Sequence, residues 1–286
     1  MKIGIAGLGK MGTNHLNELR KDDEFKVAAL YDLRQNAEFK EPFYTNLDEF
    51  LKANLDIVII ATPTSTHLEL AKAILAKVKC VLIEKPLAMN LKEMNEIKEL
   101  AKKHESSVAV GFSERFNPAI LALKKELANE KIISINIKRY SPFPARISDV
   151  GILQDLSIHD IDLVGFLSGE SFAKQGLLSL KKDDREIEAI ITLQSGLNSK
   201  QNIIAAVHQS WNCALKIRLV SVITENAFFE ADLNNFSLQK NDLPLALQGV
   251  SPLFSEHKEL LDLAKSGKMG RLASIKDALN AQACLE

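Results

Sequence analysis

The part of the chain up to Asn117 alternates short apolar runs with stretches of helical periodicity. Runs such as 56–61 and 79–83 have the length and the Ile and Val content of buried strands. Helical patterns such as 66–77 and 91–104 separate them. Strands that alternate with helices form βαβ units, which place parallel strands between two layers of helices. The sequence therefore predicts an α/β fold here, a doubly wound parallel sheet of the Rossmann type.

The alternation stops at Asn117-Pro118, and strand candidates then follow one another with short polar turns between them. The clearest of them are 186–192, 202–211 and 216–224. Successive strands joined by short turns pair antiparallel. We expect residues 1–117 to form a dinucleotide-binding domain. Residues 118–286 should form an α+β domain with an open, largely antiparallel sheet that serves substrate binding and oligomerisation.

A glycine-rich turn, GLGKMG, joins the first predicted strand to the first predicted helix. In dinucleotide folds the first glycine permits the tight turn, the second lets the backbone approach a pyrophosphate, and the third lets the helix pack closely on the strand. The phosphates then face the free N–H groups at the positive end of the helix. An ordinary βα turn is the alternative, which this context disfavours. We expect cofactor contacts from Gly7, Gly9, Lys10, Met11 and Gly12.

An acidic residue, Asp32, ends the second predicted strand, twenty positions after Gly12. Its carboxylate can accept hydrogen bonds from the adenosine ribose hydroxyls, and its charge would repel a 2′-phosphate. Arg34 is the counter-argument, because a nearby Arg can accommodate that phosphate. We therefore expect NAD as the cofactor, with NADP as the less favoured alternative.

Polar residues follow the third predicted strand. Thr62 and Pro63 lie beside the expected path of the cofactor, and we expect them to contact it. His67 comes slightly later and could either contact the cofactor or be exposed at the start of a helix. We include it among the candidate cofactor-binding residues.

The tripeptide Glu84-Lys85-Pro86 directly follows the apolar run Cys80-Val-Leu-Ile83. A charged pair at the end of a buried strand must be paired or used. Ligands of open α/β sheets bind outside the carboxyl ends of the strands. The sequence therefore predicts that Lys85 lies at a ligand site.

The second half offers a candidate acid–base pair, Asp155 and His159, four residues apart on a predicted helix over 154–167. This spacing places both side chains on one face, and Asp162 could meet His159 from the other side. A carboxylate that accepts one imidazole N–H leaves the other nitrogen free as a base. A surface Asp–His pair is the alternative, but a dinucleotide fold brings no base of its own. Asp160 is expected to face solvent.

Composition excludes several classes of protein. The chain has 36 basic and 37 acidic residues, so no basic surplus indicates nucleic-acid binding. No apolar stretch approaches the roughly 20 residues that span a bilayer, and no signal peptide is recognisable. The three cysteines are scattered without metal-ligand spacing. We expect a cytoplasmic protein with reduced cysteines and no metal, membrane or nucleic-acid partner.

These features together resemble the glucose-fructose oxidoreductase / inositol dehydrogenase / rhizopine catabolism family. The resemblance covers essentially the whole chain and rests on Gly7–Gly12, Thr62-Pro63, Glu84-Lys85-Pro86 and Asp155-xxx-His159. It implies that Lys85 and His159 meet across the domain interface at the nicotinamide. His159 would be the general base, Lys85 would contact the substrate hydroxyl, Asp155 would bind substrate, and Glu84 would lie near the nicotinamide. The Lys85–Pro86 peptide is often cis in relatives, which the sequence leaves open.

Two segments, 111–118 and 139–151, are similar to those of bacterial UDP-N-acetylglucosamine 3-dehydrogenases within this family, although Phe112 stands where those relatives commonly have His. This resemblance implies oxidation of a sugar nucleotide to its 3-keto form for 2,3-diamino sugar synthesis of the lipid A type. Arg is suited to a diphosphate. The expected substrate-binding residues are Arg115, Asn117, Tyr140, Arg146, Asp155 and His159, with Tyr140 either stacking on substrate or simply packing.

Two other functions stay open: a dehydrogenase of a free sugar or polyol such as inositol, and an NAD-binding regulator without catalysis. The presence of Lys85, Asp155 and His159 favours an enzyme. Relatives are commonly dimers or tetramers. The Ile- and Val-rich strands of the second domain predict a homodimer or homotetramer through that sheet.

Overall fold

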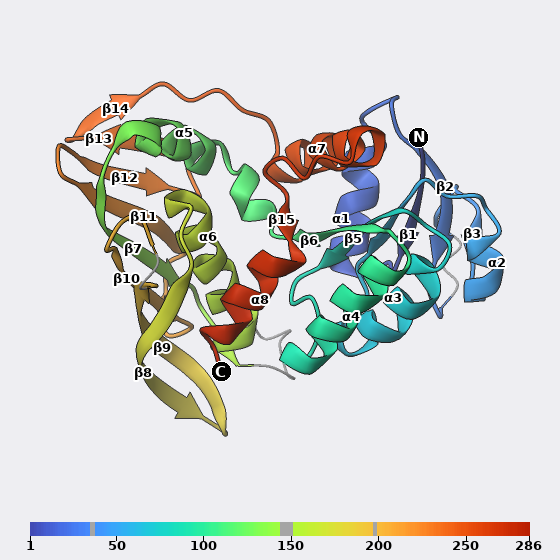
Figure 1. The fold of residues 1–286 in the computed structure, drawn as a ribbon, viewed down its shortest axis with the longest axis horizontal. Coiled ribbons are helices and arrows are strands. Elements are labelled where there is room, and N and C mark those ends of the chain that lie inside the picture. Colours follow the sequence, from blue (N-terminus) through green and yellow to red (C-terminus); the bar gives the residue numbers. More distant parts are fainter. Residues whose placement is uncertain (35–37, 144–150, 197–198) are drawn as a thin grey trace. The chain divides into compact units, whose positions relative to one another are not determined.

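A computed structural model gives the fold of the 286-residue chain (Figure 1). The structure describes residues 1–34, 38–143, 151–196 and 199–286. The chain divides into two compact units. The first comprises Met1–Ser113 and Leu253–Leu279, and the second comprises Glu114–Pro252 and Asn280–Glu286. The sequence-based division at 117/118 differs from this one, because most of the C-terminal region returns to the first unit.

Within the described residues, the first unit holds a seven-stranded sheet. Its strands are β1 (Lys2–Ala6), β2 (Lys26–Tyr31), β3 (Phe43–Tyr44), β4 (Ile57–Ile60), β5 (Cys80–Glu84), β6 (Ser107–Gly111) and β15 (Ala273–Ser274). They lie in the order β15-β6-β5-β4-β1-β2-β3. All neighbours from β3 to β6 pair parallel, and β15 joins antiparallel to β6. The predicted doubly wound sheet is confirmed.

Helices cover both faces of this sheet (Figure 1), because the strand order reverses at β1 and right-handed crossovers in opposite directions lie on opposite faces. They are α1 (Lys10–Leu19), α2 (Leu47–Leu51), α3 (His67–Leu75), α4 (Leu91–Lys103) and α7 (Pro252–Ser266), while α8 (Ile275–Ala283) runs on into the residues of the second unit. Figure 1 shows α3 and α4 side by side over one face. Every residue of β4 and β5 is buried, which explains why both strands read as continuous apolar runs.

The position of β1 between β2 and β4 fixes the place of the site. The chain moves outward in one direction from β1 through β2 to β3, and in the other direction from β4 through β5 to β6. Ligands of such sheets bind at this reversal, outside the carboxyl ends of the strands. Gly7, Asp32 and Thr62 directly follow β1, β2 and β4 or lie within two residues of them.

The second unit contains a mixed eight-stranded sheet within its described residues. Its strands are β7 (Ile132–Tyr140), β8 (Phe172–Lys182), β9 (Arg185–Ser195), β10 (Ile204–Ser210), β11 (Ile217–Thr224), β12 (Phe228–Asp232), β13 (Ser237–Lys240) and β14 (Leu243–Leu245). The order is β14-β13-β12-β11-β7-β10-β9-β8, and only β7 and β10 pair parallel. The helices α5 (Pro118–Glu126) and α6 (Ile158–Ser168) pack on one face (Figure 1). The predicted largely antiparallel sheet is confirmed.

Two local features differ from the sequence-based expectation. The edge strand β8 was not predicted, because most of its residues are exposed and its apolar side chains do not alternate with polar ones. The predicted continuous helix over 154–167 is instead a π-helical turn, Leu153–Ser157, followed by α6. No helix in the described parts of the chain is long and apolar enough to cross a membrane.

Candidate active site

The glycine turn after β1 has the geometry that a pyrophosphate requires. Gly7 has φ +91°, and a Cβ there would lie 2.7 Å from the Ala61 carbonyl group. A Cβ on Gly12 would lie 1.8 Å from the Gly7 carbonyl oxygen, so the helix packs directly on the turn. A Cβ on Gly9 would meet nothing within 4 Å. The middle glycine therefore faces open space where a ligand can approach the backbone.

The same turn begins α1 without a side-chain cap. Gly9 is the N-cap residue, and the first turn of α1 contains no acidic side chain. The N–H groups of the first turn of a helix have no partner within the helix. Those of Lys10, Met11 and Gly12 can therefore bind an anion, which the helix dipole also favours.

Asp32 is held by backbone N–H groups on both sides. Its Oδ2 accepts a hydrogen bond from Leu8 N at 2.8 Å, and its Oδ1 accepts one from Arg34 N at 3.1 Å. An ionised carboxylate has about four lone-pair positions, and these two contacts use two of them. The carboxylate can therefore accept two further hydrogen bonds, one at each oxygen. The two hydroxyl groups of a ribose are donors of the right kind.

A pocket of about 440 Å³ lies against this turn. The surface of this pocket is mostly apolar, with Pro63 and Leu70 among the lining residues, while Asp32 supplies the carboxylate. The lining residues are Gly7, Gly9, Tyr31, Asp32, Leu33, Arg34, Ala61, Thr62, Pro63, Thr66 and Leu70. Apolar walls suit a base, a fixed carboxylate suits a ribose, and an open helix N-terminus suits phosphates. The residues present therefore fit the adenosine and pyrophosphate parts of a dinucleotide.

His67 is fully buried in the first turn of α3 and does not line that pocket. Its Nε2 lies 2.9 Å from the Thr62 carbonyl oxygen, and its Nδ1 lies 3.1 Å from that of Pro86. Burial lowers the pKa of His67, and its contacts with the Thr62, Leu87 and Pro86 carbonyls oppose this shift. The ring thus links the loop after β4 to the loop after β5. Thr62 of the first loop lines the pocket, so His67 supports the candidate cofactor site indirectly.

Glu84 is nearly buried at the end of β5. Its Oε1 lies 2.9 Å from His15 Nε2, and its Oε2 accepts a hydrogen bond from Lys85 N at 3.3 Å. Gly111, its partner on β6, has no room for a side chain, because a Cβ there would lie 2.7 Å from Glu84 Oε1. The Lys85–Pro86 peptide is cis. The carboxylate is therefore held from three sides, directly beside Lys85.

In the second unit, Asp155 lies in the π-helical turn and His159 in the first turn of α6, and both are partly exposed. The Asp155 N–H donates to the Gly151 carbonyl at 3.2 Å. π-helical turns inside helices are frequent at functional sites. The four-residue spacing of this pair therefore does not follow the regular α-helical geometry that the sequence predicted.

The prediction that Asp160 faces solvent is wrong. Its side chain has no exposed area and packs against the sheet, where Asp160 Oδ1 lies 2.7 Å from Arg139 Nη2. Gln209 donates a hydrogen bond to Asp160 Oδ2 at 2.9 Å. A sequence signal for this contact existed: Arg139 follows Ile135 and Ile137 at alternate positions of β7, so it shares their buried face.

Three expected substrate ligands have partners within the second unit. Arg115 is buried, with its Nε 2.8 Å from Asp162 Oδ2. Asn117 caps α5 by accepting from Ala119 N at 3.0 Å and donates to the Leu233 carbonyl. The Tyr140 hydroxyl lies 2.8 Å from His208 Nδ1, with the two rings edge to face. Each of these contacts gives its residue a structural role within the second unit. Arg146 lies outside the described residues.

Known proteins are similar to this chain in sequence and in fold. Residues 1–112 match the family model GFO_IDH_MocA, described as oxidoreductase family, NAD-binding Rossmann fold. Myo-inositol 2-dehydrogenase of Thermotoga maritima is 32% identical over 59% of this chain and 55% of that protein. UDP-N-acetylglucosamine 3-dehydrogenase of Acidithiobacillus ferrooxidans is 27% identical over 98% of this chain and 88% of that protein. A solved structure of the latter has a TM-score of 0.87 at 22% identity and covers 100% of this chain and 95% of its own.

These likenesses carry different weight. The structural likeness, at 22% identity, shows a common fold along the whole chain. The match to the inositol dehydrogenase spans little more than half of that protein. The family model covers the residues that form the glycine turn, the Asp32 pocket and the Glu84-Lys85-Pro86 segment. Residues 1–112, which carry these motifs, therefore match the oxidoreductase family with an NAD-binding Rossmann fold.

Proposed function

We propose that the protein is an NAD-dependent dehydrogenase that oxidises a secondary hydroxyl of a sugar nucleotide, with carbon 3 of UDP-N-acetylglucosamine as the leading substrate position. The observation that supports this proposal most is the alignment with UDP-N-acetylglucosamine 3-dehydrogenase, which covers 98% of the chain and so includes both units. The inositol dehydrogenase has the higher identity but aligns with only 59% of the chain. Oxidation of a free polyol such as myo-inositol is therefore the second candidate.

The first unit would hold NAD through groups whose geometry is described above. Gly9 and the first-turn N–H groups of α1 would bind the pyrophosphate. Asp32 would accept hydrogen bonds from the adenosine ribose and disfavour a 2′-phosphate. Thr62 and Pro63, which line the same pocket, would contact the cofactor beyond the ribose. NAD, when bound, supplies a hydride acceptor at nicotinamide C4.

Side chains of the protein would accept the proton of the substrate hydroxyl and stabilise its oxygen. In the proposed reaction the substrate hydroxyl gives its proton to the His159 imidazole while its carbon loses a hydride, which leaves a ketone. The Lys85 ammonium would donate a hydrogen bond to the same oxygen and stabilise the negative charge that develops there. Asp155 would bind the substrate and orient it. The proposal requires Lys85 and His159 to act on one hydroxyl.

The proposed substrate also carries a diphosphate. Because Arg115 and Arg139 already pair with Asp162 and Asp160, we do not assign them to phosphate. Lys138 is exposed on β7, and Arg146 follows in the segment similar to the UDP-sugar dehydrogenases. These two side chains would bind the diphosphate in the proposed complex.

A substrate comparison tests the function directly. Formation of NADH is followed with UDP-N-acetylglucosamine, with myo-inositol and without a second substrate. We expect turnover of the sugar nucleotide and a product with a ketone at carbon 3, identified by mass spectrometry and NMR. Turnover of myo-inositol alone would overturn the choice of substrate. NAD binding without turnover of either compound would favour a regulator.

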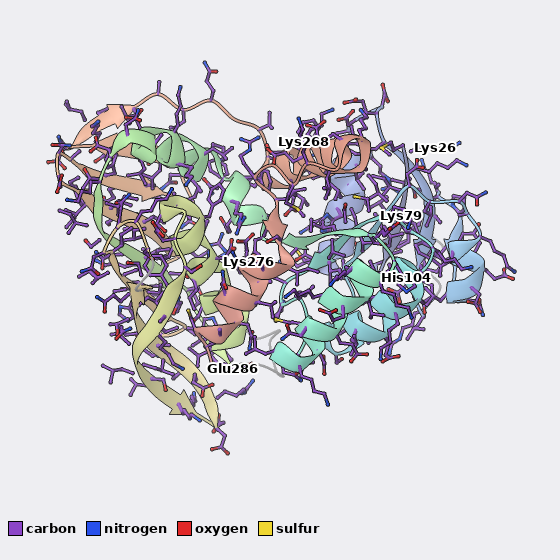
Figure 2. The ribbon with its side chains drawn as sticks, in the orientation of Figure 1. Lys26, Lys79, His104, Lys268, Lys276 and Glu286 are labelled. Carbon is purple, nitrogen blue, oxygen red and sulfur yellow. The ribbon has the colours of Figure 1, made fainter. Side chains whose placement is uncertain are left out.

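Variants of Lys85 and His159 test the site, with a variant of a second lysine as the matched control. Lys85→Ala and His159→Ala should each lower kcat by about 10²–10⁴-fold, the usual contribution of acid–base groups. Lys79→Ala is the control, since Lys79 precedes the opposite end of β5 and its ammonium bonds the His104 carbonyl (Figure 2). Full activity in both the Lys85 and the His159 variants would contradict the assignment.

A further inference from the structure

Three buried titratable groups form a continuous line of contacts inside the first unit, which we call the histidine line. Glu84 Oε1 lies 2.9 Å from His15 Nε2, and His15 Nδ1 lies 2.8 Å from His257 Nε2. The three side chains come from β5, α1 and α7. Glu84 is 6% exposed, His15 0% and His257 1%. The histidine line is therefore closed to bulk water at every contact.

The far end of the histidine line is apolar. Burial and the neighbouring His15 lower the pKa of His257 well below its usual value, so His257 is neutral. Its Nδ1 is buried and has no hydrogen-bond partner among the residues that the structure describes, and the Phe25 ring packs edge-on at 6.2 Å. A neutral imidazole has one N–H and one lone pair. The polar contact of His257 in this line is thus made by Nε2, toward His15.

The near end of the histidine line is Glu84, which contacts the backbone of Lys85. Glu84 uses one oxygen for His15 and the other for the Lys85 N–H. A carboxylate that is removed from water must be compensated by charge or hydrogen bonds. His15 provides that compensation, and Gly111 leaves room for the carboxylate, because a Cβ there would lie 2.7 Å from Glu84 Oε1. The position of the Glu84 carboxylate therefore depends on the His15 ring, and the ring depends on His257.

We propose that His15 and His257 are positioning residues, which fix Glu84 and through it the peptide that carries Lys85. This inference rests on the proposed function, in which Lys85 contacts the substrate hydroxyl. It gives the returning helix α7 a role in the reaction, because α7 supplies His257. Misplacing a reacting group by about 1 Å can cost about 10²-fold in rate, so a remote ring can affect kcat strongly.

The test uses the full-length chain and four variants. His257→Phe keeps a ring but removes the nitrogen that faces His15, and His257→Gln restores a polar group that can reach His15. His15→Leu removes the contact with Glu84. His104→Gln is the control, because His104 follows α4 in the same unit and takes no part in the histidine line (Figure 2). Thermal unfolding of each variant shows whether it folds.

We expect kcat to fall about 10-fold in His257→Phe and about 100-fold in His15→Leu, with the Kd of NAD within about 2-fold of the original. His257→Gln should recover most of the loss, and His104→Gln should be unchanged. A packing role alone would not give this recovery. If the folded His257→Phe variant keeps the original kcat, or if kcat and NAD affinity fall together without recovery in His257→Gln, the inference is wrong.

A second readout needs no substrate, so it separates this inference from the proposed function. In NMR spectra of the protein labelled with ¹⁵N, His257→Phe should shift both the ring signals of His15 and the backbone amide signal of Lys85, whereas His104→Gln should shift neither. If no sugar or polyol is oxidised, the proposed function fails and these signals still decide whether the histidine line reaches Lys85. An unmoved Lys85 signal in His257→Phe would overturn the inference.

Discussion

Asp160 and Arg139 form an ion pair from which water is excluded, between α6 and the central strand β7. Their nearest atoms, Oδ1 and Nη2, are 2.7 Å apart, which makes a close ion pair. Gln209 on β10 bonds the other Asp160 oxygen and accepts a hydrogen bond from Ser157 at 3.0 Å. Burial raises the pKa of Asp160, and Arg139 opposes this shift. The helix that carries His159 is therefore tied to two strands.

Neutralising one partner of this pair should lower the free energy of unfolding. Asp160→Asn leaves the buried Arg139 charge with the more distant Glu114 carboxylate, 3.9 Å away, and we expect the free energy of unfolding to fall by about 3–5 kcal/mol. The double variant Asp160→Leu/Arg139→Met removes both charges and should recover most of this loss. Urea denaturation measures both values, with the exposed Asp242→Asn as control. A loss below about 1 kcal/mol in Asp160→Asn would contradict the role given to the pair.

Two glycines of the same turn should respond differently to alanine. In Gly12→Ala the new Cβ would lie 1.8 Å from the Gly7 carbonyl oxygen, so the turn or the helix must move and the protein should be destabilised. In Gly9→Ala the new Cβ meets no atom within 4 Å, so the fold should be kept. That Cβ would occupy the approach to the pyrophosphate, and we expect NAD affinity to fall at least about 10-fold.

Thermal unfolding and calorimetric titration with NAD check both glycine variants. The expected pattern is a lower Tm for Gly12→Ala, and an unchanged Tm with weakened binding for Gly9→Ala. Unchanged affinity in Gly9→Ala would remove the glycine turn from the proposed cofactor site.

The first sheet could be predicted because buried parallel strands are continuous apolar runs and the glycine turn marks the reversal of strand order. β8 escaped prediction because an exposed edge strand needs no apolar pattern. The return of 253–279 to the first unit depends on contacts such as His15 with His257, 242 positions apart, which no local pattern records. The burial of Asp160 could not be predicted from α6 alone, because it depends on an ion pair with Arg139 on the distant strand β7.

Asp32 should determine the choice of cofactor. Its carboxylate is the acidic group of the pocket, and Arg34 beside it could bind a phosphate. In Asp32→Ser the charge that repels a 2′-phosphate is gone, and a hydroxyl remains. We expect NAD to bind about 10–100-fold more weakly, as for loss of hydrogen bonds to a charged group.

NADP should bind more tightly to Asp32→Ser than to the original protein, and adding Arg34→Ala should cancel that gain. Calorimetric titration of each protein with both dinucleotides measures these affinities, with Asp48→Ser on α2 as the control. Equal preference for NAD in the original protein and in Asp32→Ser would show that another group selects the cofactor.

His67 should make the stability of the first unit sensitive to mild acid. Burial, against the opposing carbonyl contacts, lowers its pKa in the folded protein below the value of about 6.5 of an unfolded chain. Between these two values the unfolded chain binds more protons, so the contribution is complete above about pH 6.5 and is lost as the pH falls toward the folded pKa. The loss is at most about 1.4 kcal/mol per pH unit from this group. His67→Gln does not titrate, so its Tm should fall less between about pH 7.5 and about pH 5 than that of the original protein, while His104→Gln should follow the original. Parallel Tm curves for the original protein and His67→Gln would show that the fold does not lower the pKa of His67.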